Sequence, residues 1–134
     1  MYKIETKIID SREQCVQFLE RITDGLIILH INICSINKHY EELLILVHEI
    51  NDAPDVVICS ETRQIDIQLY RLPGYTAYYN GGNINQNDGV ITYVKSNLRN
   101  QIKIENIGEI LVNKTTVHKN SVIYDIIGVI SHQQ

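Results

Sequence analysis

The fold is decided by residues 26–62, which read LIILHINICSINKHYEELLILVHEINDAPDVVICSET. Two apolar runs in this stretch, residues 26–33 and 55–60, are bounded by turn signals, a pattern typical of strands covered on both faces. The residues between them carry the spacing of a helix. Strand, helix and strand within about 35 residues make a βαβ unit, so we expect the two strands to lie parallel.

The connecting helix is predicted from Ser35, as its capping residue, to about Ile50. Its apolar residues recur at spacings of four and three and form one stripe, which consists of Ile36, Tyr40, Leu43, Val47 and Ile50. The turn-forming residues 51–54, Asn-Asp-Ala-Pro, end the helix.

The flanking segments complete a mixed α/β fold. Residues 2–9 predict an edge strand, and Ser11 with Gln14 fits a capping box for a helix to Ile22. Beyond the βαβ unit, closely spaced strands without helices predict an antiparallel meander and a mixed sheet. These strands are expected at 76–79, 89–95, around 102–104, 109–112 and 122–130. We divide the chain into an amino-terminal extension, 1–25, and a main domain, 26–134.

The composition is typical of one soluble domain. The chain has 134 residues, of which 44% are hydrophobic and 21% charged, so wholesale disorder is not expected. The apolar runs, such as the largely apolar segment 26–31, are too short to cross a bilayer, and charged residues interrupt the amino terminus before any signal peptide could form. We therefore expect an intracellular protein without a membrane partner. Cys15, Cys34 and Cys59 show no paired spacing, which favours structural thiols.

The net charge of −4 hides an asymmetry. Residues 1–70 have a balance of −6, whereas residues 71–134 have a balance of +2. The second half could supply a basic surface for nucleic acid through Lys95, Arg99, Lys103, Lys114 and Lys119. A mildly basic solvated face explains the same residues. Similarly, Tyr70, Tyr75, Tyr78 and Tyr79 could stack on bases or belong to a half-buried strand.

Two polar residues follow the parallel strands at their carboxyl ends, where sites form in open α/β sheets. Asn32 ends the first strand and Glu61 follows the second. If the strands are neighbours, the amide and the carboxylate can point into one crevice and bind Mg²⁺, which takes one or two carboxylates plus water and substrate phosphate. From the spacing alone, an equally good interpretation is that Asn32 caps a turn and Glu61 is a solvated strand end.

The order of motifs resembles the endonuclease domain of non-long-terminal-repeat retrotransposons, a branch of the endonuclease/exonuclease/phosphatase superfamily. That family has a buried strand ending in Asn, a Ser-Leu-Asn-Lys-like helix start, and a strand ending in Glu-Thr. The later segments LPGYTAYYN, NDGVITYVKSNL and YDIIGVI are similar to its next three elements, although Asp88 replaces a family glycine. The resemblance covers about residues 26–130.

The resemblance implies a four-layered α/β sandwich of the DNase I and AP-endonuclease type, present only in part, and Mg²⁺-dependent cleavage of DNA. It also implies that Asn32 and Glu61 are catalytic residues of the metal and phosphate site, with Thr62 supporting the carboxylate. Nuclear entry would follow, although the sequence contains no basic targeting run.

Two departures from the family pattern bear on catalysis. The family's Tyr-Arg-Pro segment is replaced by Ile130-Ser131-His132, and its later Asp-x-Asn and Ser-Asp-His motifs have no counterpart in these residues. Cleavage needs an oriented nucleophile as well as a metal ion, so we expect a truncated, inactive half. His132 is read as a frayed terminal residue. His30 lies inside the first predicted strand and could orient Asn32, but it is read as a satisfied core residue.

Two other functions remain open at this point. One is a phosphatase of the same superfamily, and the other is a non-catalytic α/β module that binds nucleic acid or protein. Because half a sandwich exposes apolar sheet surface and unpaired strand edges, we also expect the isolated chain to be marginally stable or to self-associate.

Overall fold

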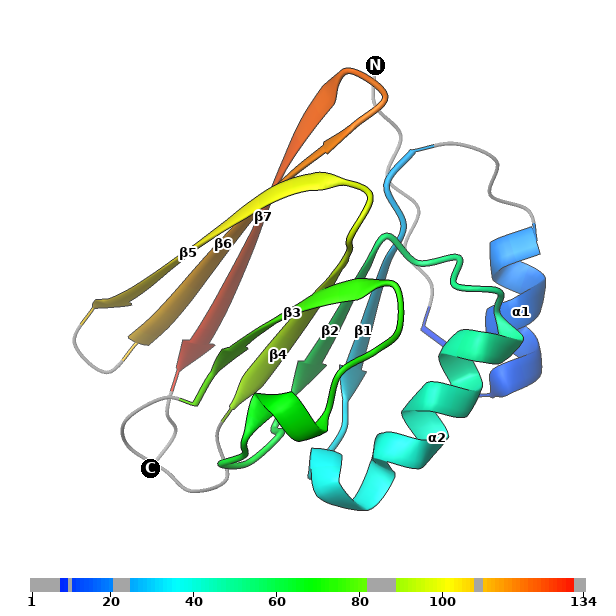
Figure 1. Ribbon diagram of the computed structural model, residues 1–134, viewed down its shortest axis with the longest axis horizontal. Helices are drawn as coiled ribbons and strands as arrows, with labels where there is room; N and C mark the ends of the chain where they lie inside the picture. The colour runs from blue at the N-terminus through cyan, green and yellow to red at the C-terminus, as the bar shows by residue number, and fades with distance from the viewer. Residues whose placement is uncertain (1–7, 10, 21–24, 82–88, 108–109, 132–134) are drawn as a thin grey trace.

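The computed structural model describes residues 8–9, 11–20, 25–81, 89–107 and 110–131 (Figure 1). In chain order the elements are α1 (Arg12–Glu20), β1 (Ile28–Asn32), α2 (Ile36–Glu49), β2 (Val56–Ser60), the 3-10 helix η1 (Ile67–Leu69), β3 (Tyr75–Asn80), β4 (Val90–Lys95), β5 (Arg99–Ile107), β6 (Ile110–Lys119) and β7 (Val122–Ser131). The strands form two sheets, with orders β1-β2-β4-β3 and β5-β6-β7.

The predicted βαβ unit is confirmed. β1 and β2 pair in parallel, from Ile28 opposite Val56 to Asn32 opposite Ser60. α2 occupies the predicted range, and its apolar stripe is buried except for Tyr40, which is partly buried. This register brings the ends of both strands to the same edge of the sheet.

The antiparallel part is confirmed, but it is divided between two sheets. β4 inserts between β2 and β3 and pairs antiparallel with both, which makes the first sheet mixed. The hairpins β5–β6 and β6–β7 form the second, purely antiparallel sheet. Figure 1 shows α1 and α2 on the side of the first sheet away from β5–β7, so the layers are helices, mixed sheet and antiparallel sheet.

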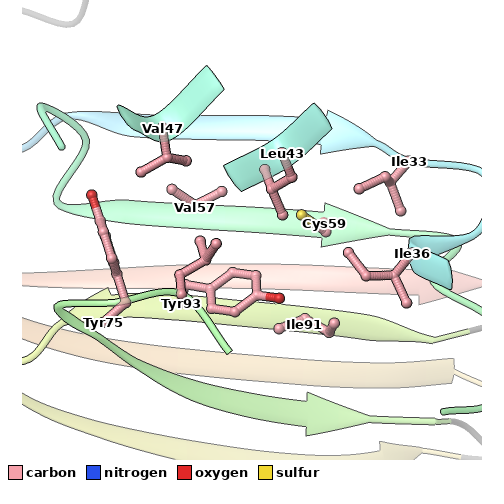
Figure 2. Packing of buried hydrophobic residues seen from close by; sticks show 10 residues of the cluster. Ile33, Ile36, Leu43, Val47, Val57, Cys59, Tyr75, Ile91 and Tyr93 are labelled. Atoms are coloured by element: carbon pink, nitrogen blue, oxygen red, sulfur yellow. The ribbon is translucent and has the colours of Figure 1, made fainter. Parts of the chain in front are cut away.

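Two apolar clusters hold these layers together. Between α2 and the first sheet, Leu43 and Val47 pack with Val57, Cys59 and Tyr93 (Figure 2). On the opposite face of that sheet, Val56 and Val94 pack against Val117 of β6. Alternate residues of β2 therefore serve alternate layers, as the two-residue period of a strand requires.

The prediction that β1 is buried on both faces is wrong. Its residues alternate between exposed and half-buried, and Ile28 is 46% exposed. β1 is the edge strand of its sheet, and the cluster between the sheets contains none of its residues. His30, predicted in the core, is consequently exposed, with its Nε2 3.1 Å from Ser60 Oγ.

Local predictions at the helix ends have mixed outcomes. The N–H of Gln14 donates to Ser11 Oγ at 3.2 Å, which confirms the start of α1. Ser35 does precede α2, but its side chain makes no capping hydrogen bond. The predicted strand at 2–9 and the helix end at Ile22 lie largely outside the described residues. None of the helices that the structure describes is long and apolar enough to cross a bilayer.

Candidate metal-binding site

The structure brings Asn32 and Glu61 together at the carboxyl ends of β1 and β2. The thiol of Cys34 lies between them, with Sγ 3.3 Å from Asn32 Oδ1 and 3.5 Å from Glu61 Oε2. All three side chains are exposed. The amide oxygen of Asn32 and a carboxylate oxygen of Glu61 therefore both lie within 3.5 Å of one atom, the Cys34 sulfur. This proximity is expected when the two strands are parallel neighbours.

Backbone hydrogen bonds connect the loop after β1 to the loop after β2. Ile33 N–H donates to Ser60 O at 3.0 Å, and Ser35 N–H donates to Glu61 O at 2.9 Å. Ile36 N–H adds a third bond to the carbonyl of Thr62, at 3.3 Å. The spacing between the two candidate ligands is thus set by the main chain.

Four non-glycine residues in these two loops have left-handed backbone conformations. They are Cys34 (φ 52°), Ser35 (φ 115°), Glu61 (φ 56°) and Arg63 (φ 68°). Such conformations cost on the order of 1 kcal/mol or more each and persist where surrounding contacts over-determine them. The loop-to-loop hydrogen bonds supply these contacts. Half of the eight non-glycine residues with positive φ in the described residues lie in the two loops of the candidate site.

Thr62 is fully buried and supports the site through the backbone. Its N–H donates to Gly89 O at 3.1 Å, and its hydroxyl donates to Arg63 O at 3.1 Å. The same carbonyl accepts the hydroxyl of Tyr79 at 3.1 Å. The resemblance implied that Thr62 would bond near the carboxylate of Glu61; instead it holds the turn on which Glu61 stands.

Sequence reasoning missed two residues, Cys34 and Arg63. The hydrogen bond to Glu61 raises the pKa of the Cys34 thiol, with smaller contributions from desolvation and from the Glu61 charge; the Arg63 charge acts in the opposite direction. Arg63 is exposed, and within the described residues its guanidinium has no hydrogen bond or ion pair. Each residue follows a predicted ligand by two positions, which is the only sequence signal that could have indicated them.

The three thiols are expected to differ in alkylation. Cys15 and Cys59 are buried, at 3% and 0% exposed, and burial raises the pKa of both thiols, that of Cys59 to about 12. Neither thiol is therefore accessible to alkylation in the native protein, whereas Cys34 is exposed. In native protein treated with iodoacetamide, mass spectrometry should find only Cys34 modified, and all three after unfolding. Because Glu61 raises the pKa of Cys34, Glu61→Gln should accelerate this labelling. Modification of native Cys59 at a comparable rate would contradict the burial described above.

The donor set at this site fits a hard cation. Mg²⁺ takes oxygen ligands and often uses one or two carboxylates, with water and phosphate completing its shell. Glu61 and Asn32 supply one carboxylate and one amide oxygen, and a cation between them would displace the S–H of Cys34. No group of three or more His, Cys, Asp or Glu side chains within the described ranges could hold a metal ion by itself.

Four of the five basic residues that could form a basic surface are paired with acidic side chains. Lys95 and Lys119 both lie against Asp55, with N···O distances of 3.8 and 2.8 Å. Lys103 pairs with Glu105 at 2.9 Å, and Lys114 lies 3.9 Å from Asp125. Of the five basic residues considered above, Arg99 alone has no ion pair among the described residues.

The tyrosines serve the fold. Tyr75 is buried and donates to Pro54 O at 2.6 Å. Tyr70 donates to Asn37 Oδ1 at 2.8 Å, and Tyr78 donates to Asn100 Oδ1 at 2.5 Å. These internal hydrogen bonds favour structural roles over stacking on bases. Tyr75 and Tyr78 lie in β3, as the strand interpretation predicts, whereas Tyr70 follows η1 and lies outside any strand.

Comparison with known proteins supports the fold. No protein-family model matches the sequence, and no curated protein matches it. Among solved structures, the chain is similar to the AP endonuclease LMAP from Leishmania major, with a TM-score of 0.55 and 16% sequence identity. The match covers 75% of this chain and 38% of that chain. The protein therefore shares the mixed α/β fold of an AP endonuclease, and it spans well under half of that endonuclease's length.

Proposed function

We propose that the protein belongs to a Mg²⁺-dependent DNA endonuclease domain of the retrotransposon type, in which Asn32 and Glu61 hold the metal ion. The observation that carries this proposal is the convergence of Asn32 Oδ1 and Glu61 Oε2 on the Cys34 thiol, at 3.3 and 3.5 Å. The fold shared with an AP endonuclease supports the nuclease assignment, and the succession of motifs quoted above supports the retrotransposon branch.

The proposed role of Asn32 and Glu61 is to bind a metal ion and to orient it. When bound, Mg²⁺ would polarise a phosphodiester and stabilise charge on the leaving oxygen. Glu61 and Asn32 would hold the cation, and the buried Thr62 would keep the Glu61 turn in place. Because no Asp-x-Asn or Ser-Asp-His motif occurs in these 134 residues, we propose that on their own they bind metal and DNA without cleaving.

Metal binding is tested directly by titrating Mg²⁺ into the 134-residue protein and measuring the heat. We expect saturable binding, and we expect Glu61→Gln to weaken it by roughly tenfold or more, because the carboxylate is the only charged ligand. The control is Glu41→Gln, which makes the same change on the exposed face of α2. Equal affinities for Glu61→Gln and the wild type would refute the metal site.

A second candidate function is a non-catalytic module that binds protein or nucleic acid. The internal pairing of Lys95, Lys103, Lys114 and Lys119 favours the protein-binding form of this candidate, because these paired lysines are not free to contact the phosphates of nucleic acid. The two proposals differ in the effect of Glu61→Ala. A nuclease domain should lose Mg²⁺-dependent DNA binding in a gel-shift experiment, whereas a non-catalytic module should retain all its binding. Release of phosphate from a small phosphorylated molecule would instead identify a phosphatase.

A further inference from the structure

We propose that two copies of this chain associate by antiparallel pairing of their β7 strands, with Ile126 of one copy opposite Ile126 of the other. β7 is the last strand in the order β5-β6-β7, and its ten residues pair only with β6 among the described residues. Within the described part of the chain, no strand pairs with the N–H and C=O groups of its other edge, which are a template for a further strand.

The composition of β7 leaves this edge unprotected. Edge strands commonly carry lysine, proline or other charges that prevent pairing. β5, at the opposite edge of the same sheet, carries Arg99, Lys103 and Glu105. β7 contains no lysine or proline, and its single charge, Asp125, is already engaged within the chain. Its carboxylate accepts from Thr116 Oγ1 at 2.7 Å and lies 3.9 Å from Lys114 Nζ.

Exposed β-branched side chains follow the same strand. Ile123, Ile127 and Val129 are 63%, 64% and 60% exposed and share the sheet face that points away from the first sheet. The opposite face of β7 carries Tyr124, Ile126 and Gly128. Antiparallel pairing of two identical β7 strands places a two-fold axis perpendicular to the sheet. Rotation about this axis leaves the side chains of each face on the same side of the extended sheet, so residues that pair between the copies belong to the same face.

The side chains select one register. With Ile126 opposite itself, Ile123 lies opposite Val129 of the second copy, an apolar β-branched pair that occurs twice. Tyr124 then lies opposite Gly128 of the second copy. Gly128 is exposed and has no atom within 4 Å of a Cβ position, so the tyrosine ring can cover it, an arrangement that stabilises edge glycines. Pairing Ile127 with itself would instead place Ile126 opposite Gly128, and the glycine would lose its aromatic cover.

Charged variants at residue 127 test both the surface and the register. In the proposed register, Ile127 lies opposite Asp125 of the second copy. Ile127→Glu should therefore weaken association by roughly tenfold or more, because like charges directly opposite each other repel. Ile127→Lys should retain association. Ile107→Glu is the matched control, since Ile107 is 61% exposed on β5 at the other edge.

Dissociation constants would be measured by sedimentation equilibrium on the 134-residue protein, after circular dichroism confirms that each variant is folded. A wild type that stays monomeric at all concentrations would overturn the proposal. So would equal weakening by Ile127→Glu and Ile127→Lys, or by Ile107→Glu.

A distance measurement provides an independent test. Residue 123 lies opposite residue 129, so the two copies of residue 123 are six positions apart along the paired strands. At about 3.3 Å per residue, their Cα atoms should be about 20 Å apart. Spin labels at Ile123→Cys, in a Cys34→Ser background that removes the exposed native thiol, should report this separation in the dimer. A single distance far from this value would exclude the register.

Discussion

Replacing Asp55 by alanine is expected to destabilise the protein by about 3–5 kcal/mol, because it removes the counterion of two partly buried lysines. Asp55 is only 2% exposed. Its Oδ2 accepts from Lys119 Nζ at 2.8 Å and from Ile27 N–H at 2.9 Å, and its Oδ1 lies 3.8 Å from Lys95 Nζ. The carboxylate therefore connects both sheets, since Lys119 ends β6 and Lys95 ends β4.

The loss would be a large fraction of the total stability, which is typically about 5–15 kcal/mol for a domain. Urea denaturation followed by circular dichroism measures it. The control is Asp125→Ala, which removes a carboxylate that is 48% exposed and also faces a lysine. Because exposed ion pairs contribute little, its effect should stay within about 1 kcal/mol. Equal losses for the two variants would show that the Asp55 cluster does not join the sheets.

The second large effect is expected for Gly89→Ala, at about 3 kcal/mol of lost stability. A Cβ on Gly89 would lie 2.3 Å from Thr62 Oγ1 and 2.8 Å from Arg63 O, and the backbone φ of +139° is itself unfavourable for alanine. Thr62 and Arg63 hold the turn that carries Glu61. We therefore expect Gly89→Ala to weaken Mg²⁺ binding as well as stability.

Two comparisons isolate the cause of this effect. Gly128→Ala makes the same substitution where no atom lies within 4 Å of the new Cβ, and in unfolding experiments on dilute protein it should change stability little. Adding Thr62→Ala to Gly89→Ala removes the closest clashing atom, so the double variant should lose less stability than the two single variants combined. Strictly additive losses would exclude steric conflict between these residues as the origin.

Much of the candidate site could be predicted because it depends on local periodicity. A βαβ unit with parallel neighbours must bring the ends of its two strands to one edge, so Asn32 and Glu61 could be paired from their positions alone. Cys34 shows no paired spacing with Cys15 or Cys59, so the sequence favours a structural thiol there. Its place between the two ligands depends on left-handed conformations in both loops, which no propensity of Cys, Ser or Glu predicts.

The sequence by itself determined the mixed α/β class, the stripe of α2, the parallel pairing of β1 with β2 and the antiparallel order of the later strands. These features follow from spacings within short segments. The tertiary structure decided the division into two sheets, the exposure of one face of β1 and the pairing of lysines that had suggested a basic surface. Lys119 reaches Asp55 across 64 positions of the chain. Contacts between residues so far apart in the chain depend on how the two sheets pack against each other. The spacing of residues within short segments does not specify this packing.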